Sequence, residues 1–238
     1  MPIRSRWTID IPRVTLPTFL FGSPSGPVPD KAALIDADRP ETHYLTHQTY
    51  RLWAKRLAAG LRAAGLQPGD AVLLYSGNTL FFPVVVLGVI MAGGIFTGAN
   101  PSYVAREVAH QLRDSGARFL VCTDASIDTG LEAARLAGLK EDSVFAFDDG
   151  YATFEGMGKP LKGCRHWSAL IADEQAGEAF EWTEGQAELG RTIALNYSSG
   201  TTGLPKGVEI THTNYVSNCT QVEFPPQCGL GPSLARKP

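Results

Sequence analysis

Apolar and polar positions change their period several times along the chain. From residue 46 apolar side chains recur every three or four positions, which predicts an amphipathic helix that ends at Gly65. The run 71–76 is apolar throughout, as in a strand covered on both faces, and the residues "QPGD" before it predict a turn. Further strands are expected over 32–37, 93–101 (ending in a loop), 117–123 and 143–149, and helices over 79–92, 104–115 and 126–138. This alternation predicts an α/β protein with a mostly parallel sheet flanked by helices.

The pattern weakens after residue 148. Residues 148–163 are predicted to form a loop, 166–175 a short helix and 178–190 an acidic connector. Two strand-like runs, 192–199 and 207–212, then enclose a segment rich in serine, threonine and glycine. The first 30 residues, rich in proline and glycine, are expected to form an irregular arm over the surface.

Composition excludes several classes of function. The 238 residues carry a net charge of −3, so no overall basic field indicates binding to nucleic acid or to an anionic membrane. The most apolar stretch, 80–96, contains Pro83 and two adjacent glycines and is shorter than the roughly 20 residues of a membrane span, so a buried helix is expected. No signal peptide is recognisable, and the final "LARKP" is neither a peroxisomal tripeptide nor a prenylation box. These features predict a soluble, cytoplasmic protein.

The cysteines and histidines do not indicate a metal centre. The four cysteines form no Cys-x-x-Cys pair, and no histidine lies at zinc-like spacing, so structural thiols and no metal ligands are expected. Only His212 adjoins the glycine-rich segment, and we do not expect it to be catalytic. No catalytic residue is assigned from the sequence.

The segment "NYSSGTTGLPKGVEITH", residues 196–212, has the residue types of a phosphate-binding loop. Glycine lets the backbone approach phosphate oxygens closely, hydroxyl groups donate hydrogen bonds, and lysine adds positive charge. The alternative is a solvent-exposed hairpin linker, which would gain nothing from a lysine fixed after Leu-Pro or from apolar strands on both sides. The candidate phosphate ligands are Ser198, Ser199, Gly200, Thr201, Thr202, Gly203 and Lys206. Gly207 is expected to allow the same close approach.

The nearest generic motif, the P-loop G-x-x-x-x-G-K-[ST], does not fit. Pro205 stands where its second glycine belongs and removes a backbone donor, while Gly207 replaces the hydroxyl residue that holds Mg²⁺. The residues that follow are strand-like, so no helix N-terminus faces the phosphates.

The residues "YSSGTTGLPKGV" resemble the AMP-binding signature of the adenylate-forming superfamily, which includes acyl- and aryl-CoA synthetases, luciferases and peptide synthetase adenylation domains. Residues 69–121 resemble the strand, helix and glycine-rich segment that precede it. The residues "GANP" and "SSGTTG" are similar to the corresponding segments of coumarate–CoA-ligase-like enzymes. Matching features run from about residue 30 to about residue 222.

The resemblance implies ATP-dependent activation of a small-molecule carboxylic acid to an acyl-adenylate, followed by thioester formation with coenzyme A. It implies Mg²⁺ and ATP as cofactors, CoA as co-substrate, and a role for the Ser/Thr/Gly loop and its lysine at the β- and γ-phosphates. Such enzymes serve secondary metabolism or fatty-acid activation. Some are peroxisomal, but no targeting tripeptide is present here.

Against this pattern, the chain is less than half the length of a typical member. The "YGxTE" segment, the ribose-binding aspartate and the C-terminal lid domain have no counterpart in it. We therefore expect an irregular arm over 1–30, an incomplete AMP-binding domain over 31–224 and an aberrant tail over 225–238. The expected product is a truncated ligase, inactive on its own. The alternatives are a deliberately short paralogue, a non-catalytic nucleotide-binding or interaction remnant, and an amidase with its nucleophile in "YSSG".

Overall fold

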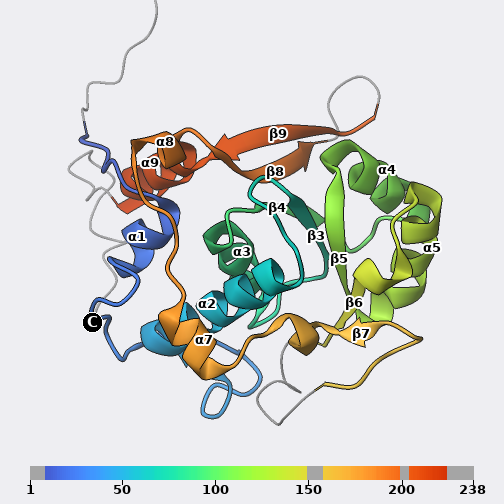
Figure 1. Cartoon of the computed structure of the whole chain (residues 1–238), viewed down its shortest axis with the longest axis horizontal. Coiled ribbons are helices and arrows are strands. Elements are labelled where there is room, and N and C mark those ends of the chain that lie inside the picture. Colours follow the sequence, from blue (N-terminus) through green and yellow to red (C-terminus); the bar gives the residue numbers. More distant parts are fainter. Residues whose placement is uncertain (1–8, 149–157, 199–203, 224–238) are drawn as a thin grey trace, which may run out of the picture.

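A seven-stranded sheet in the order β7-β6-β5-β3-β4-β8-β9 forms the centre of the protein (Figure 1). The computed structural model describes residues 9–148, 158–198 and 204–223. All neighbouring strands run parallel except β8 and β9, which are antiparallel. The strands are β3 (Ala71–Tyr75), β4 (Ile95–Ala99), β5 (Ala117–Thr123), β6 (Val144–Phe147), β7 (Arg165–His166), β8 (Thr192–Ser198) and β9 (Lys206–Thr211). The α/β fold with a mostly parallel sheet, predicted from the alternating pattern, is confirmed.

Helices cover both faces of this sheet (Figure 1). The helices α2 (His47–Ala63) and α3 (Phe82–Met91) pack against one face of the sheet. The helices α4 (Ala105–Ser115) and α5 (Ile127–Ala137) pack against the other face. The remaining helices lie mainly outside these two layers: α1 (Leu16–Phe21), α7 (Glu174–Ala179), α8 (Gln186–Leu189) and α9 (His212–Glu223). Short 3₁₀ helices span Asp124–Ser126, Glu141–Ser143 and Trp167–Leu170, and β1 (Ala32–Ile35) and β2 (Tyr44–Thr46) form a separate antiparallel pair.

The central strand β3 separates the two hydrophobic cores. Its side chains alternate between the faces, so Leu74 packs toward α2 and α3 while Leu73 packs toward α4 and α5. The first core holds a chain of edge-to-face aromatic contacts, in which the Phe81 ring lies 5.3 Å from Trp53 and 5.6 Å from Trp167. Such burial on both faces explains why β3 is apolar throughout.

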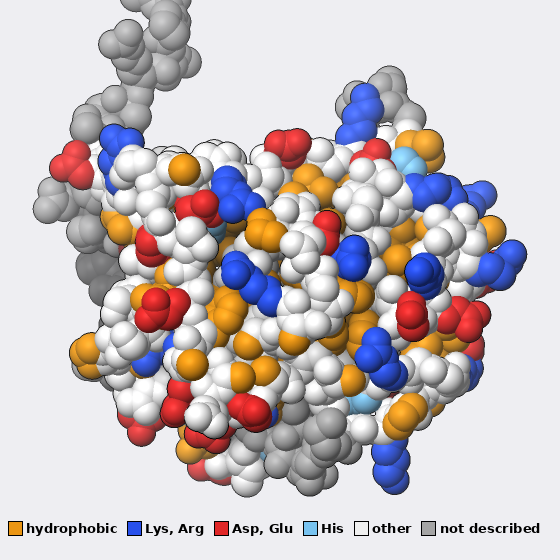
Figure 2. All heavy atoms as spheres, in the orientation of Figure 1, with side chains coloured by type: hydrophobic (Ala, Val, Ile, Leu, Met, Phe, Trp, Pro, Cys, Tyr) orange, Lys and Arg blue, Asp and Glu red, His pale blue; other side chains and the backbone are white. Residues whose placement is uncertain are grey.

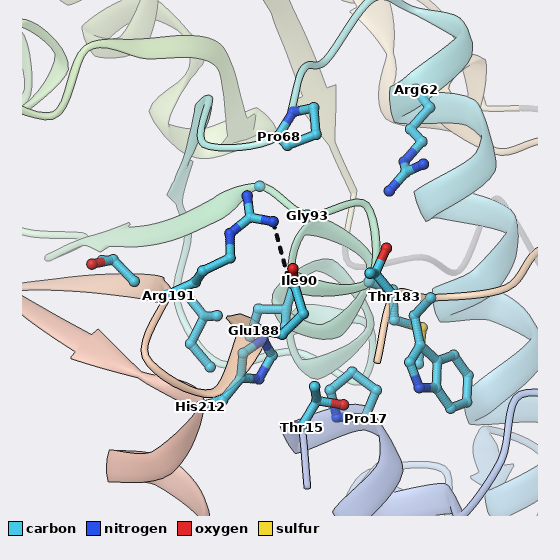
Figure 3. A pocket seen from close by; sticks show the side chains of 15 residues that line it. Thr15, Pro17, Arg62, Pro68, Ile90, Gly93, Thr183, Glu188, Arg191 and His212 are labelled. Carbon is cyan, nitrogen blue, oxygen red and sulfur yellow. Dashed lines mark hydrogen bonds and ion pairs between the residues drawn. The ribbon is translucent and has the colours of Figure 1, made fainter. Parts of the chain in front are cut away.

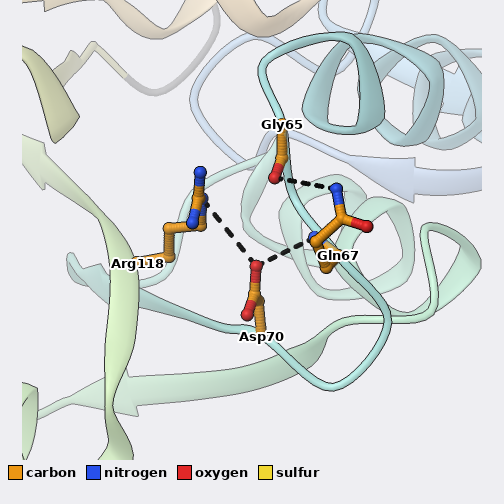
Figure 4. A network of polar contacts seen from close by, with 4 residues as sticks. All are labelled: Gly65, Gln67, Asp70 and Arg118. Atoms are coloured by element: carbon orange, nitrogen blue, oxygen red, sulfur yellow. Dashed lines mark hydrogen bonds and ion pairs between the residues drawn. The ribbon is translucent and has the colours of Figure 1, made fainter.

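The predicted "QPGD" turn joins α2 to β3 at the amino end of the sheet (Figure 4). The Asp70 carboxylate accepts the Gln67 backbone N–H at 2.9 Å, and the Gln67 side-chain amide donates to the Gly65 carbonyl oxygen at 3.3 Å. Arg118, at the start of β5, lies 3.8 Å from the same carboxylate. Gly65 and Gly69 have positive φ angles of 93° and 91°, which other residues adopt only with strain. The turn that the residues "QPGD" predict is therefore confirmed.

The predicted helices and strands up to residue 148 are present, with shifted ends. α3 begins at Phe82 rather than near residue 79, because Pro83 lacks an N–H and suits only the first turn of a helix. The first 30 residues, expected to be irregular, contain α1, whose Leu16 and Phe21 are buried.

Sequence patterning is less accurate between residues 158 and 190. The prediction of one helix over 166–175 is wrong, since a 3₁₀ turn ends at Leu170 and α7 begins separately after Asp173. The Ala172 backbone N–H donates to the Arg56 carbonyl oxygen at 3.1 Å, and the Asp173 carboxylate caps α7. The acidic connector contains α8, and the two-residue strand β7 has no period to reveal it.

No helix in the described part of the chain is long and apolar enough to cross a membrane. The apolar stretch 80–96 instead supplies α3 and β4. Glycine lets α3 approach α2, because a Cβ at Gly88 would lie 2.7 Å from the Leu57 side chain.

Candidate functional site

The strands β8 and β9, which flank the glycine-rich segment in the sequence, lie at one edge of the sheet (Figure 1). Ser198 and Lys206 are directly paired across the two strands, and both are exposed. Of the predicted phosphate ligands, five lie outside the described residues: Ser199, Gly200, Thr201, Thr202 and Gly203. The structure therefore brings the first and last members of the predicted set together at the base of the hairpin.

This geometry differs from a P-loop, as the sequence predicts. A P-loop leads from a strand into a helix, whereas Lys206 here begins β9, which runs antiparallel to β8. The Lys206 side chain has no hydrogen-bond or ion-pair partner among the residues that the structure describes.

Gly207 has a packing role that the sequence does not reveal. A Cβ at this position would lie 3.1 Å from the Tyr197 ring, which covers it from the opposite strand. Any larger residue would push this ring away from the hairpin. The close approach of Gly207 to phosphate stays a prediction, and the structure adds a contact of Gly207 with an aromatic ring.

Two side chains of α4 contact the two arms of the hairpin. The His110 Nε2–H donates to the Pro205 carbonyl oxygen at 2.9 Å, and the Tyr197 hydroxyl donates to Asp114 Oδ2 at 2.6 Å. Burial, together with the Asp114 carboxylate, raises the pKa of Tyr197, so its hydroxyl stays protonated at neutral pH. Sequence reasoning misses His110 and Asp114. Their spacing of four places them on one face of a helix, which is the only signal the sequence carries.

Charge does not set this site apart on the surface. On the face shown in Figure 2, lysine and arginine side chains are interspersed with aspartate and glutamate. Leu204 and Val208, which flank Lys206, are 67% and 53% exposed. Among the described residues no group of three or more His, Cys, Asp or Glu side chains is arranged to hold a metal ion.

His212, the first residue of α9, follows β9 directly and lines a pocket together with Thr15, Pro17 and Arg191 (Figure 3). It is 6% exposed, and its Nδ1 accepts the Leu16 backbone N–H at 3.0 Å, which ties α1 to the start of α9. Burial lowers the pKa of this imidazole, partly offset by the nearby Glu188 and Glu184 carboxylates. Neutral His212 is the form that can accept this hydrogen bond.

A carboxylate strengthens the same junction. Glu184 accepts hydrogen bonds from the hydroxyls of Thr15 and Thr18 and, at 3.0 Å, from the Trp182 indole N–H. The N-terminal segment is therefore bonded to a residue that precedes β8 in the sequence, Glu184, and to one that follows β9, His212.

Comparison with known proteins now identifies the family. The model of the AMP-binding enzyme family matches residues 26–234, past the boundary predicted at residue 224. Phenylacetyl-CoA ligase epaB from Aspergillus niger is 36% identical over 218 residues, which cover 90% of this chain and 39% of that enzyme. 4-Coumarate–CoA ligase from Pinus taeda is 36% identical over 195 residues, covering 81% of this chain and 32% of that enzyme.

A solved structure agrees. The ATP-bound MatB from Rhodopseudomonas palustris superposes with a TM-score of 0.63 and 26% identity, over 86% of this chain and 36% of that one. The chain thus spans between about a third and two fifths of the length of these relatives. The family match covers most of the chain, and the parallel sheet and the signature hairpin agree with it: the chain belongs to the AMP-binding enzyme family.

Proposed function

We propose that this chain forms the ATP-phosphate-binding part of an acyl- or aryl-CoA ligase. The observation that supports it most directly is the hairpin, where Ser198 and Lys206 flank the glycine-rich segment and the Lys206 side chain has no partner among the described residues. The similarity to two CoA ligases over 81–90% of this chain supports the same assignment.

In the proposed reaction the carboxylate of the acid attacks the α-phosphorus of ATP, and pyrophosphate leaves with the bonding electrons. The thiol of coenzyme A then attacks the acyl carbon, releases AMP and gives up its proton. Negative charge grows on the β-phosphate during the first step, so positively charged and hydrogen-bonding groups placed there lower the barrier. We assign this role to Lys206 and the Ser198 hydroxyl, with Mg²⁺ supplying additional positive charge.

In this proposal the substrate is an aliphatic or aromatic carboxylic acid. Its identity rests on the relatives, whose names specify phenylacetate and 4-coumarate, both aromatic. Because this chain corresponds to at most 39% of those two enzymes, we propose that the 238-residue polypeptide binds nucleotide phosphates without completing adenylation.

Calorimetric titration of the 238-residue chain with MgATP and with pyrophosphate tests this function. We expect both to bind, and Lys206→Ala to weaken each by roughly tenfold or more, since it removes a charge-assisted contact. ATP–pyrophosphate exchange by the same chain should stay at background.

Lys140→Ala is the matched control, because Lys140 is an exposed lysine far along the chain from the hairpin. It should bind like the wild-type chain. Absence of binding, or equal affinity in Lys206→Ala, would contradict the phosphate role. Exchange well above background would contradict the incomplete reaction and favour a self-sufficient enzyme.

A further inference from the structure

The hairpin that carries Lys206 lies at the edge of the sheet, and its attachment to the rest of the molecule is limited. β9 pairs with β8 in the described part of the chain, and none of its six residues is buried: Lys206, Val208 and Glu209 are exposed and the other three are half-buried. A groove of about 350 Å³ lies between α4 and the hairpin, lined by Arg106, His110, Tyr197 and Leu204 among others. Close apolar packing therefore does not hold the two together along their length.

Two polar contacts span this gap, one to each arm. Tyr197 immediately precedes Ser198, and Pro205 immediately precedes Lys206, so the contacts are made one residue from each end of the predicted ligand set. His110 and Asp114 lie one helical turn apart on α4, which matches the separation of neighbouring strands. The bond from Tyr197 ends on a carboxylate, and such charge-assisted bonds are stronger than neutral ones.

Gln111, which follows His110, bonds α4 itself to the sheet. The Gln111 side-chain amide donates to Thr97 Oγ1 at 2.8 Å and to the Gly98 carbonyl oxygen at 3.0 Å, while the Thr97 hydroxyl donates to the Leu195 carbonyl oxygen at 2.9 Å. Gln111 and Thr97 are both buried. This chain of bonds links α4, β4 and β8, so the position of α4 relative to β8 is fixed independently of the contacts that α4 makes with the hairpin.

We propose that His110 and Asp114 are positioning residues for the phosphate-binding hairpin, and we call this pair the α4 brace. Neither contacts phosphate in this proposal. The brace holds both arms of the hairpin against one rigid helix, which sets where Ser198 and Lys206 lie relative to the sheet. Binding is tighter when such groups do not have to be ordered by the ligand. The inference rests on the proposed phosphate role of the hairpin.

Hydrogen–deuterium exchange of the intact 238-residue chain tests the brace without any ligand. In His110→Ala and Asp114→Ala, we expect amides of residues 206–211 to exchange roughly three- to tenfold faster, the range expected from loss of one hydrogen bond. Residues 71–75 should exchange as in the wild-type chain. Unchanged exchange over 206–211 in both variants would overturn the brace, whatever their affinity for nucleotide.

Conservative replacements separate positioning from general destabilisation. Glutamine at 110 retains an N–H donor and asparagine at 114 retains an acceptor oxygen, so His110→Gln and Asp114→Asn should restore much of the slow exchange. His47→Ala is the matched control, because the His47 ring bonds the Lys31 carbonyl oxygen at 3.0 Å, away from the hairpin. A control variant that speeds exchange over 206–211 as much as His110→Ala would also overturn the proposal.

Calorimetry with MgATP and pyrophosphate then connects the brace to function. His110→Ala and Asp114→Ala should each weaken binding roughly three- to tenfold, and His110→Gln and Asp114→Asn should bind nearly as the wild-type chain does. If the wild-type chain binds neither probe, the proposed function fails, while the exchange measurement still decides whether the brace exists. If the wild-type chain binds and the alanine variants bind equally well, the brace has no positioning role.

Discussion

The strands β3 and β9 belong to one sheet but differ in almost every physical respect. β3 lies between two parallel neighbours and is buried at all five positions, with Leu73 and Leu74 completely inaccessible. β9 is antiparallel, has β8 as its neighbour within the described residues, and leaves Val208 more than half exposed. The first strand is covered by helices on both faces, whereas polar contacts from α4 hold the hairpin of the second.

The difference separates stability from chemistry. Apolar burial supplies most of the free energy of folding, and that burial is concentrated around β3. A phosphate-binding group must remain accessible and charged, which excludes it from such a core. We therefore expect substitutions in β3 to change the free energy of unfolding strongly, and substitutions in β9 to change ligand binding with little effect on folding.

Truncation of a β3 side chain has the largest expected effect. Leu73→Ala leaves a cavity among residues of α4, α5 and β5 that cannot collapse fully, and should lower the free energy of unfolding by about 2–5 kcal/mol. Urea denaturation followed by circular dichroism measures this change. A loss below about 1 kcal/mol would show that the core around β3 is loosely packed, and the comparison with β9 would fail.

How far the sequence predicts each strand follows from the same contrast. An uninterrupted apolar run bounded by a glycine turn predicts β3, because burial on both faces is a local property of the residues. The hairpin can be recognised by its signature, which places Ser198 and Lys206. Its supports cannot, since His110 and Pro205 are 95 residues apart and Tyr197 and Asp114 are 83 apart. Neither a period nor a motif connects such positions.

The same reasoning explains the other differences. α1 begins at Leu16, whose N–H is bound by His212, and β7 consists of two residues that pair with β6. Both elements depend on partners distant in the sequence rather than on their own residue pattern. The turn before β3 is predicted correctly because the side-chain bonds that shape it, among Gly65, Gln67 and Asp70, are local.

His212, the residue that follows β9, should give an intermediate effect. His212→Ala leaves the buried Leu16 N–H without its acceptor, and we expect the free energy of unfolding to fall by about 1–3 kcal/mol. The loss should exceed that of an exposed β9 substitution because this contact ties α1 to α9. Urea denaturation at pH 7.5 measures it, and a change within error would contradict the assigned hydrogen bond.

The pH dependence of the same contact has a definite sign. Burial lowers the pKa of His212 in the folded chain below the unfolded value of 6.5, with Glu184, Glu188 and Arg191 as the charged groups nearby. The unfolded chain therefore takes up a proton first as pH falls, and stability declines from about pH 6.5 downward through the folded pKa. His212→Ala should show a smaller decline between pH 7 and 5 than the wild-type chain, and an equal decline would refute this linkage.

The smallest effect is expected for the exposed face of β9. Val208→Ala removes two methyl groups that are already largely in water, so the free energy of unfolding should change by no more than about 0.5 kcal/mol. Because Val208 is two residues from Lys206 and pairs with Asn196, the substitution also tests whether the hairpin tolerates change beside the phosphate site. Matched urea titrations of Val208→Ala and Leu73→Ala compare the two strands directly. If Val208→Ala cost more than about 1.5 kcal/mol, this face would have to be covered in solution, and a concentration-dependent midpoint would identify a second copy of the chain as the cover.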